Sequence, residues 1–208
     1  QDTVYKALTG LARVAKSGES VSGDNYSFLE LSGTGELLMV LTDGMGSGEM
    51  ADCDSSNLIE ALEYLMEAGF EKKSALRLLN TLFVANYEGK SFATLDMAAI
   101  NLHTGICEIM KNGAATTFVK REDGVEMIAS SALPVGVDLQ AEPDVAIVQL
   151  QEGDMVIMVS DGVLDSFYER NIESDSQEEM ATLIDRLYCK NANDMANQIL
   201  MNTLAHST

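Results

Sequence analysis

The fold prediction starts from one stretch, Leu37-Leu38-Met39-Val40-Leu41-Thr42-Asp43-Gly44. Five consecutive apolar residues that run into turn-forming residues are typical of a buried β-strand. A second stretch repeats the pattern: Met155-Val156-Ile157-Met158-Val159-Ser160-Asp161-Gly162. Each strand would end on a carboxylate that the backbone holds firmly and that solvent can still reach. If the two strands are neighbours, Asp43 and Asp161 would form a site for a hard divalent cation, which prefers oxygen ligands.

Hydrophobic spacing predicts the elements on either side of these strands. Period-two alternation and Gly-containing turns favour short strands at 3–14, 26–31, 98–102, 106–110, 117–120, 125–128 and 145–150. Period-3.6 spacing favours helices at 58–66 and 75–83, and two more from about residue 176. Because most strand connections are short, the sheets should be mostly antiparallel. We therefore predict an α+β fold: an αββα sandwich of two stacked sheets flanked by helix pairs, with residues 1–208 as a single domain.

The amino-acid composition indicates which kinds of molecule the chain is expected to bind. The chain has 208 residues, 46% of them hydrophobic, which is enough for a substantial core. Thirteen basic and 33 acidic residues give a net charge of -20, so nucleic acid is not an expected partner. Such an acidic surface favours cations or basic protein patches.

Cysteine usage and hydropathy bear on the cellular setting. Cys53, Cys107 and Cys189 show no paired spacing, which argues against a zinc site or a disulfide framework and favours a reducing, cytoplasmic location. There is no apolar run near 18 residues, so no membrane contact is expected from this stretch of chain. Because the sequence starts at Gln1, we expect it to be a fragment of a longer protein, and a membrane-anchored parent is compatible with it.

The candidate ligands favour one kind of metal. Asp24 lies in a Ser-Gly-Asp loop, and Asp43 and Asp161 each precede a glycine, which lets the backbone turn sharply and offers a carbonyl as a further ligand. Oxygen ligands without histidine or thiolate suit Mg²⁺ or Mn²⁺ rather than zinc. A pair of such ions can activate water and neutralise a phosphoryl group. The alternative is that each Asp-Gly pair is an ordinary turn signal.

Several short motifs occur together in one order. They are Val21-Ser22-Gly23-Asp24-Asn25-Tyr26, Asp43-Gly44-Met45-Gly46-Ser47-Gly48, Ala93-Thr94-Leu95-Asp96, Leu133-Pro134-Val135-Gly136 and Ser160-Asp161-Gly162. In this order they resemble the metal-dependent protein serine/threonine phosphatases (type 2C, PPM), and most closely the phosphatase domains of the stage II sporulation protein E family. The resemblance covers nearly the whole chain.

The resemblance implies a site and a reaction. Asp43 would bridge two ions, Mn²⁺ or Mg²⁺, with Asp24 and the Gly44 carbonyl holding one and Asp161 the other, so that Asp43 and Asp161 count as catalytic. Water would attack phosphoserine or phosphothreonine directly, without a phosphoenzyme. The implied substrate is a small regulatory phosphoprotein of the anti-sigma-factor antagonist type, in sporulation control. The resemblance does not identify substrate-binding residues, and it leaves a homodimer open.

One departure from the family favours an alternative. The family carries a further ligand Asp near its C-terminus, at the start of a last strand, whereas Asn193-Asp194-Met195 opens a helical pattern here. The metal site of this stretch of chain is therefore expected to be incomplete. A catalytically incomplete module that acts as a protein-binding or dimerisation platform is the alternative function.

Other patterns are weaker. Gly44-x-Gly46-x-Gly48 suggests a dinucleotide loop, but the stretch that should form its second strand is helical. Asp52-x-Asp54-x-Ser56 imitates a calcium loop, but a helix start with its N-cap at 54–56 explains it better. A cysteine phosphatase would need Arg six positions after its cysteine, and Ile, Gly and Met stand there. Neither His103 nor His206 is assigned a role.

Overall fold

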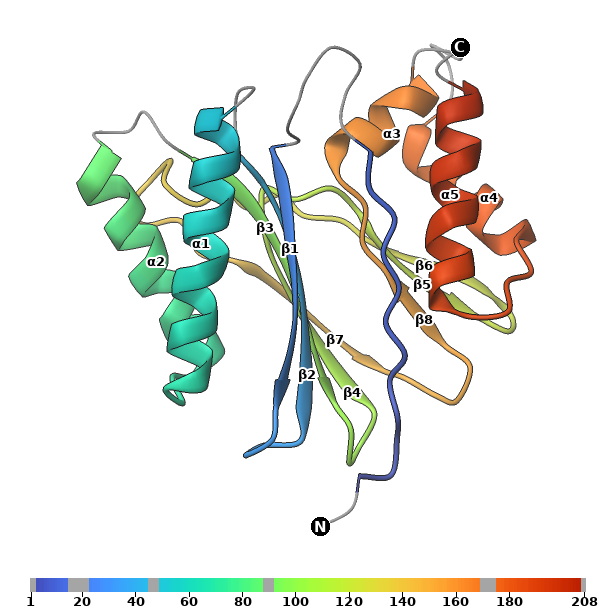
Figure 1. Ribbon diagram of the computed structural model, residues 1–208, viewed down its shortest axis with the longest axis horizontal. Helices are drawn as coiled ribbons and strands as arrows, with labels where there is room; N and C mark the ends of the chain where they lie inside the picture. Colours follow the sequence, from blue (N-terminus) through green and yellow to red (C-terminus); the bar gives the residue numbers. More distant parts are fainter. Residues whose placement is uncertain (1–2, 15–22, 45–48, 88–91, 169–174, 207–208) are drawn as a thin grey trace. The chain divides into compact units, whose positions relative to one another are not determined.

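The strands and helices follow one another in the order shown in Figure 1. This computed structural model describes residues 3–14, 23–44, 49–87, 92–168 and 175–206. The elements are β1 (Asp24–Leu31), β2 (Glu36–Gly44), α1 (Glu49–Glu67), α2 (Lys72–Tyr87), β3 (Ala93–Asn101), β4 (Ile106–Asn112), β5 (Thr117–Arg121), β6 (Gly124–Ile128), β7 (Asp144–Gln149), β8 (Met155–Ile157), α3 (Asp161–Tyr168), α4 (Ser176–Arg186) and α5 (Ala192–His206).

The chain divides into two compact units that alternate along the sequence. Unit 1 comprises residues 1–5, 15–114 and 130–150. Unit 2 comprises residues 6–14, 115–129 and 151–208. The two aspartates that end the apolar stretches therefore fall in different units, Asp43 in unit 1 and Asp161 in unit 2.

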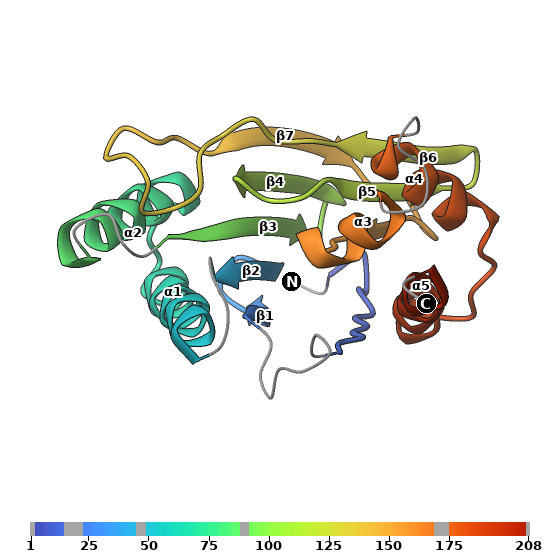
Figure 2. The ribbon, with the colours of Figure 1, turned by 90° about the horizontal axis from the view of Figure 1, so that it is seen from above.

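Unit 1 contains a five-stranded sheet with the order β1-β2-β3-β4-β7, in which all neighbours are antiparallel. The β1–β2 and β3–β4 hairpins each turn at a glycine with positive φ, Gly35 (68°) and Gly105 (74°), a conformation that other residues adopt at a cost. Figure 2 shows β2, β3 and β4 as successive strands of this sheet.

Helices α1 and α2 cover one face of the unit 1 sheet. Alternate strand residues pack with the apolar stripes of both helices into one core. Its buried members are Leu38, Val40, Leu58, Ile59, Leu62, Met66, Ala75, Leu76, Leu79, Phe83, Ala93, Leu95, Met97, Ala99, Met110 and Val135. The intervening strand residues, Asp43 among them, therefore lie on the opposite face of the sheet.

Unit 2 combines a three-stranded antiparallel sheet, β6-β5-β8, with helices α3, α4 and α5. Its core gathers Phe118, Val159, Leu164, Met180, Ile184, Met195 and Ile199. Both ends of α4 are satisfied by side chains: Asp175 accepts the amide of Gln177 at 2.9 Å, and Lys120 donates to the Ile184 carbonyl at 2.8 Å. The α+β prediction with antiparallel sheets is confirmed.

The predicted strand at 3–14 is wrong within the described residues. Residues 6–14 belong to unit 2, where they run in an irregular conformation past the start of α5. Gly10 lies so close to α5 that an added Cβ would come 2.2 Å from the Ala192 carbonyl carbon, and the Leu11 amide donates to Asn193 Oδ1 at 3.1 Å. A helix end therefore holds this segment instead of a neighbouring strand.

The second apolar stretch also differs from its prediction. Strand β8 covers only Met155–Ile157, and all three of its residues are half-buried rather than buried on both faces. Helix α3 then begins at Asp161, which the spacing had placed at the end of a strand. None of the described helices is both long enough and apolar enough to span a bilayer.

Candidate functional site

Asp24 and Asp43 face each other across the first two strands of unit 1. They are direct partners in the antiparallel β1–β2 register. Side chains in such a pair have Cβ atoms about 4.5–5.5 Å apart. Two like charges at that spacing repel, and a divalent cation between them would remove the repulsion. The first two carboxylates of the predicted ligand set are therefore brought together.

Gly44 supplies the backbone part of the same site. Its amide donates to the Gly23 carbonyl at 3.2 Å, so the residues before β1 and at the end of β2 are tied together. An added Cβ on Gly23 would meet both the Gly44 carbonyl oxygen, at 3.4 Å, and Asp43 Oδ1, at 3.5 Å. A carbonyl and a carboxylate oxygen thus border one small space, and this donor chemistry fits Mg²⁺ or Mn²⁺.

Helix α1 explains why position 44 is glycine. An added Cβ on Gly44 would lie 2.0 Å from the Ala51 carbonyl oxygen and 2.8 Å from its Cα. The obstruction is helix backbone, which cannot rotate away as a side chain could. Any larger residue at position 44 would therefore displace the start of α1.

Buried hydrogen bonds fasten α1 to the start of β1. The Ser55 hydroxyl, which is 0% exposed, donates to the Gly23 carbonyl at 2.7 Å and accepts from Asn25 Nδ2 at 2.8 Å. Asn25 also donates to Asp52 Oδ1 at 2.9 Å. The Thr42 hydroxyl reaches the Ser55 carbonyl at 3.4 Å. Polar contacts on the helix-facing side thus fix the backbone that carries the two aspartates.

Strand β3 supports the same backbone from its other side. The Asp43 amide donates to Thr94 Oγ1 at 3.1 Å, and Thr94 is the register partner of Asp43. Asp96, the last residue of the Ala93-Thr94-Leu95-Asp96 motif, forms a buried ion pair with Lys111. Lys111 was missed, although a hairpin centred on the predicted turn at 103–105 places it opposite Asp96.

Asp161 occupies the first residue of α3 in unit 2 and is exposed. The Ser160 carbonyl accepts the Val163 amide at 3.0 Å, which starts the helix. A carboxylate in a first turn is favoured by the helix dipole. Within the described ranges, no three His, Cys, Asp or Glu side chains form a group that could hold a metal ion.

The remaining motif residues have structural roles where they are described. Helix α1 begins at Glu49, so the predicted helix start at 54–56 is wrong, and Asp52 and Asp54 lie inside the helix. The His103 ring packs against Gly35. Val135 exchanges backbone hydrogen bonds of 3.1 and 2.9 Å with Ala93, as a turn beside β3. The motif residues 21–22 and 45–48 lie outside the described residues.

Asp194 sits in the first turn of α5, as its helical pattern predicts. Its Oδ2 accepts the Lys190 amide at 3.0 Å, and its own amide donates to Asn191 Oδ1 at 2.9 Å. The side chain thus completes a helix start and does not open a strand.

Comparison with known proteins identifies relatives of this chain. A family model described as stage II sporulation protein E matches residues 33–208. Stage II sporulation protein E of Bacillus subtilis (strain 168) is 36% identical over 161 residues, which make up 77% of this chain and 19% of that protein. Phosphoserine phosphatase RsbU of the same organism is 22% identical over 191 residues, 91% of this chain and 56% of RsbU.

Solved structures show the same fold. The PP2C phosphatase domain of SpoIIE from Bacillus subtilis, solved with a fragment of its regulatory domain, superposes with a TM-score of 0.90 at 29% identity, covering 99% of this chain and 60% of that chain. RsbX in complex with magnesium shares the fold at 17% identity, with a TM-score of 0.71 and coverage of 93% and 86%. Because the family model matches most of its length, the chain belongs to the stage II sporulation protein E family and is a phosphatase domain of the metal-dependent PP2C type.

Proposed function

We propose that this chain hydrolyses phosphoserine or phosphothreonine in a protein, using two Mn²⁺ or Mg²⁺ ions held by Asp24, Asp43, Gly44 and Asp161. The observation that carries the proposal is the direct opposition of Asp24 and Asp43, with the Gly44 carbonyl beside Asp43. The resemblance to the family implies that Asp43 would contribute to both ions, that Asp24 and the Gly44 carbonyl would help to hold one, and that Asp161 would help to hold the other. Such ions, when bound, act as Lewis acids and lower the pKa of a coordinated water.

The residues of the chain contribute position and charge to this reaction. Asp24 and Asp43 present oxygens on adjacent strands whose register is fixed, and the Thr94 hydroxyl holds the Asp43 backbone. This rigidity sets the geometry before the substrate arrives, which is the main protein contribution to phosphoryl transfer. Cys107 is poorly suited to act as a nucleophile, because burial first, and then the charges of Asp96 and Glu108, raise the pKa of its thiol to about 12.

The proposed substrate is a small regulatory phosphoprotein of the anti-sigma-factor antagonist type, phosphorylated on serine, in sporulation control. Membership of the stage II sporulation protein E family supports this choice, as does the relative that is named a phosphoserine phosphatase. The chain spans 19% of the length of the Bacillus subtilis family member, so this substrate, a cytoplasmic location and a membrane-anchored parent are proposals for the whole protein.

Phosphate release tests the proposal. A phosphoserine protein is incubated with the chain in Mn²⁺ and in EDTA, and the assay is repeated with Asp43→Ala and Asp161→Ala. Calorimetric titration with Mn²⁺ on the same samples separates a loss of metal from a loss of chemistry. We expect EDTA and each substitution to abolish release. Release that survives EDTA and both substitutions would exclude the proposed mechanism.

A second candidate function is a binding module with the phosphatase fold and an incomplete metal site. One observation favours it: Asp194 serves a helix start and does not open a last strand. The two candidates differ in one experiment. A binding module, as a monomer or as a dimer, would co-elute with the phosphoprotein in size-exclusion chromatography, yet it would release no phosphate at saturating Mn²⁺.

A further inference from the structure

A buried ion pair lies in the unit 1 sheet, away from the proposed metal ligands in sequence. Lys111 Nζ of β4 is 2.5 Å from Asp96 Oδ2 of β3, and the two side chains are only 1% and 2% exposed. The residues are direct partners in the β3–β4 register. Buried ion pairs contribute little net stability, because desolvation offsets their attraction. The pair therefore calls for an explanation other than fold stability.

The pair shares a sheet face with the metal ligands. Leu95 and Met97 belong to the core under α1 and α2, so Asp96 between them points to the other face. Asp43 lies on that face too, since its neighbour Thr42 contacts α1. Asp43 pairs with Thr94, two residues before Asp96. Asp96 is therefore a diagonal neighbour of Asp43, at a distance of about 7–8 Å.

The strand order gives the pair a direction. The sheet runs β1-β2-β3-β4, so Asp96 stands on the strand next to that of Asp43, and Lys111 stands one strand further away. The negative end of the pair thus faces Asp24 and Asp43. Because both side chains are buried, solvent screens this dipole weakly.

The charge of Asp96 acts beyond its partner. Cys107 lies four residues from Lys111 on β4, and burial, followed by the charges of Asp96 and Glu108, raises the pKa of its thiol to about 12. Toward β2, the strand order places Asp96 nearer than Lys111.

We infer that the Asp96–Lys111 pair is a charge-positioning device that raises the affinity of the Asp24–Asp43 site for a divalent cation. This inference rests on the proposed function, because it needs that metal site. The carboxylate attracts the cation, while the adjacent ammonium ion allows the carboxylate to stay ionised inside the sheet. Asp96 and Lys111 are positioning residues and do not contact the substrate.

The expected size follows from the geometry. A divalent ion at the site would lie roughly 8 Å from the carboxylate and roughly 10–11 Å from the ammonium nitrogen. With an effective dielectric constant of about 20, the difference between attraction and repulsion corresponds to about fivefold in affinity. Reversing the dipole should therefore weaken binding by about 25-fold relative to the original chain.

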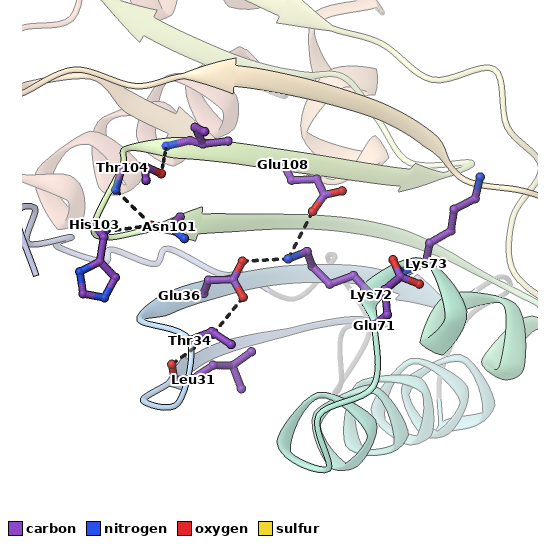
Figure 3. A network of polar contacts seen from close by, with 11 residues as sticks. Leu31, Thr34, Glu36, Glu71, Lys72, Lys73, Asn101, His103, Thr104 and Glu108 are labelled. Carbon is purple, nitrogen blue, oxygen red and sulfur yellow. Dashed lines mark hydrogen bonds and ion pairs between the residues drawn. The ribbon is translucent and has the colours of Figure 1, made fainter. Parts of the chain in front are cut away.

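Two double variants test the inference. Asp96→Asn/Lys111→Met removes both charges with similar shapes, and Asp96→Lys/Lys111→Asp reverses them. The matched control is Glu36→Gln/Lys72→Met, which removes an ion pair of 2.8 Å between β2 and α2 in the same unit. Figure 3 shows this control pair, with Lys72 between Glu36 and Glu108. Glu36 lies seven residues from Asp43 along β2, about 23 Å.

The readout is the Mn²⁺ dissociation constant from calorimetry, with thermal unfolding in EDTA as the check of folding. We expect a fivefold loss for the neutral pair, a larger loss for the reversed pair and no change for the control. If Asp96→Asn/Lys111→Met does not fold, the Mn²⁺ dissociation constant of Asp96→Lys/Lys111→Asp tests the inference instead. Unchanged Mn²⁺ affinity in a folded variant, or an equal loss in the control, overturns the inference.

An Asp43→Ala arm separates the two proposals. If the original chain binds Mn²⁺ and Asp43→Ala abolishes binding while the neutral pair binds normally, only the positioning role fails. If Asp43→Ala leaves Mn²⁺ binding intact, the proposed metal site itself is wrong, and the positioning role is overturned with it.

Discussion

Replacing Ser55 by Ala removes the hydroxyl that joins α1 to the loop before Asp24. The hydroxyl donates to the Gly23 carbonyl at 2.7 Å and accepts from Asn25 at 2.8 Å, and the residue is 0% exposed. Each buried neutral hydrogen bond contributes about 1 kcal/mol net. The higher helix propensity of Ala returns about 0.5 kcal/mol. We therefore expect Ser55→Ala to lower the free energy of unfolding by about 1.5 kcal/mol.

Urea denaturation followed by circular dichroism measures this loss. With a denaturant slope of about 2 kcal/mol per molar urea, the midpoint should fall by about 0.7 M. The control is Ser56→Ala, the half-buried neighbour on the same helix, for which we expect a much smaller change. A Ser55→Ala midpoint within about 0.2 M of the original chain would refute the view that this hydroxyl fastens α1 to the sheet.

Three further predictions concern the site, acid stability and thiol chemistry. Gly44→Ala should lower the free energy of unfolding by more than about 2 kcal/mol and abolish Mn²⁺ binding in calorimetry, because the new Cβ would lie 2.0 Å from the backbone of α1. The control Gly162→Ala should be tolerated, because the added Cβ would have open space around it. Hydrogen bonds from the backbone of the residues at 131–132 lower the pKa of Asp144. Its stabilising contribution is therefore complete above the ordinary pKa of 3.8 and is lost as pH falls through the lower pKa of the folded state. Asp144→Asn should reduce the loss of stability at acid pH in a plot of urea midpoint against pH, and an unchanged plot would contradict this. Iodoacetamide at pH 8 should modify the exposed Cys53 in the folded protein and leave Cys107 unmodified, because the Cys107 thiol is buried and its pKa is raised to about 12. If mass spectrometry finds both cysteines modified at equal rates, the buried position of Cys107 in β4 is wrong.

The first apolar stretch was predictable because its signal is local and strong. A run of five apolar residues before Thr42, bounded by turn-forming residues, favours a buried strand of that length, and β2 extends through Asp43 to Gly44. The resemblance implied that Asp24 and Asp43 share a metal ion, but their direct pairing in the β1–β2 register was not predicted, because register depends on turn geometry that the sequence specifies weakly.

The second stretch shows where sequence reasoning fails. Apolar residues from 155 to 159 indicate a strand, but β8 ends at Ile157, so Met158 and Val159 lie outside it. Val159 packs instead in the core that the helices of unit 2 share. Tertiary packing overrides strand propensity there. Asp161 consequently opens α3, and whether it joins Asp43 at a metal stays a prediction.

The alternation of the two units along the sequence has a consequence for biosynthesis. All parts of unit 1 have been synthesised once residue 150 is added, whereas unit 2 needs residues 6–14 together with the last helix, as in the contact between Leu11 and Asn193. Bringing together residues 182 positions apart carries a larger entropic cost than pairing the consecutive strands of unit 1. We expect unit 1 to gain amide protection first during refolding, and pulsed hydrogen exchange that finds α5 protected before β2 would contradict this order.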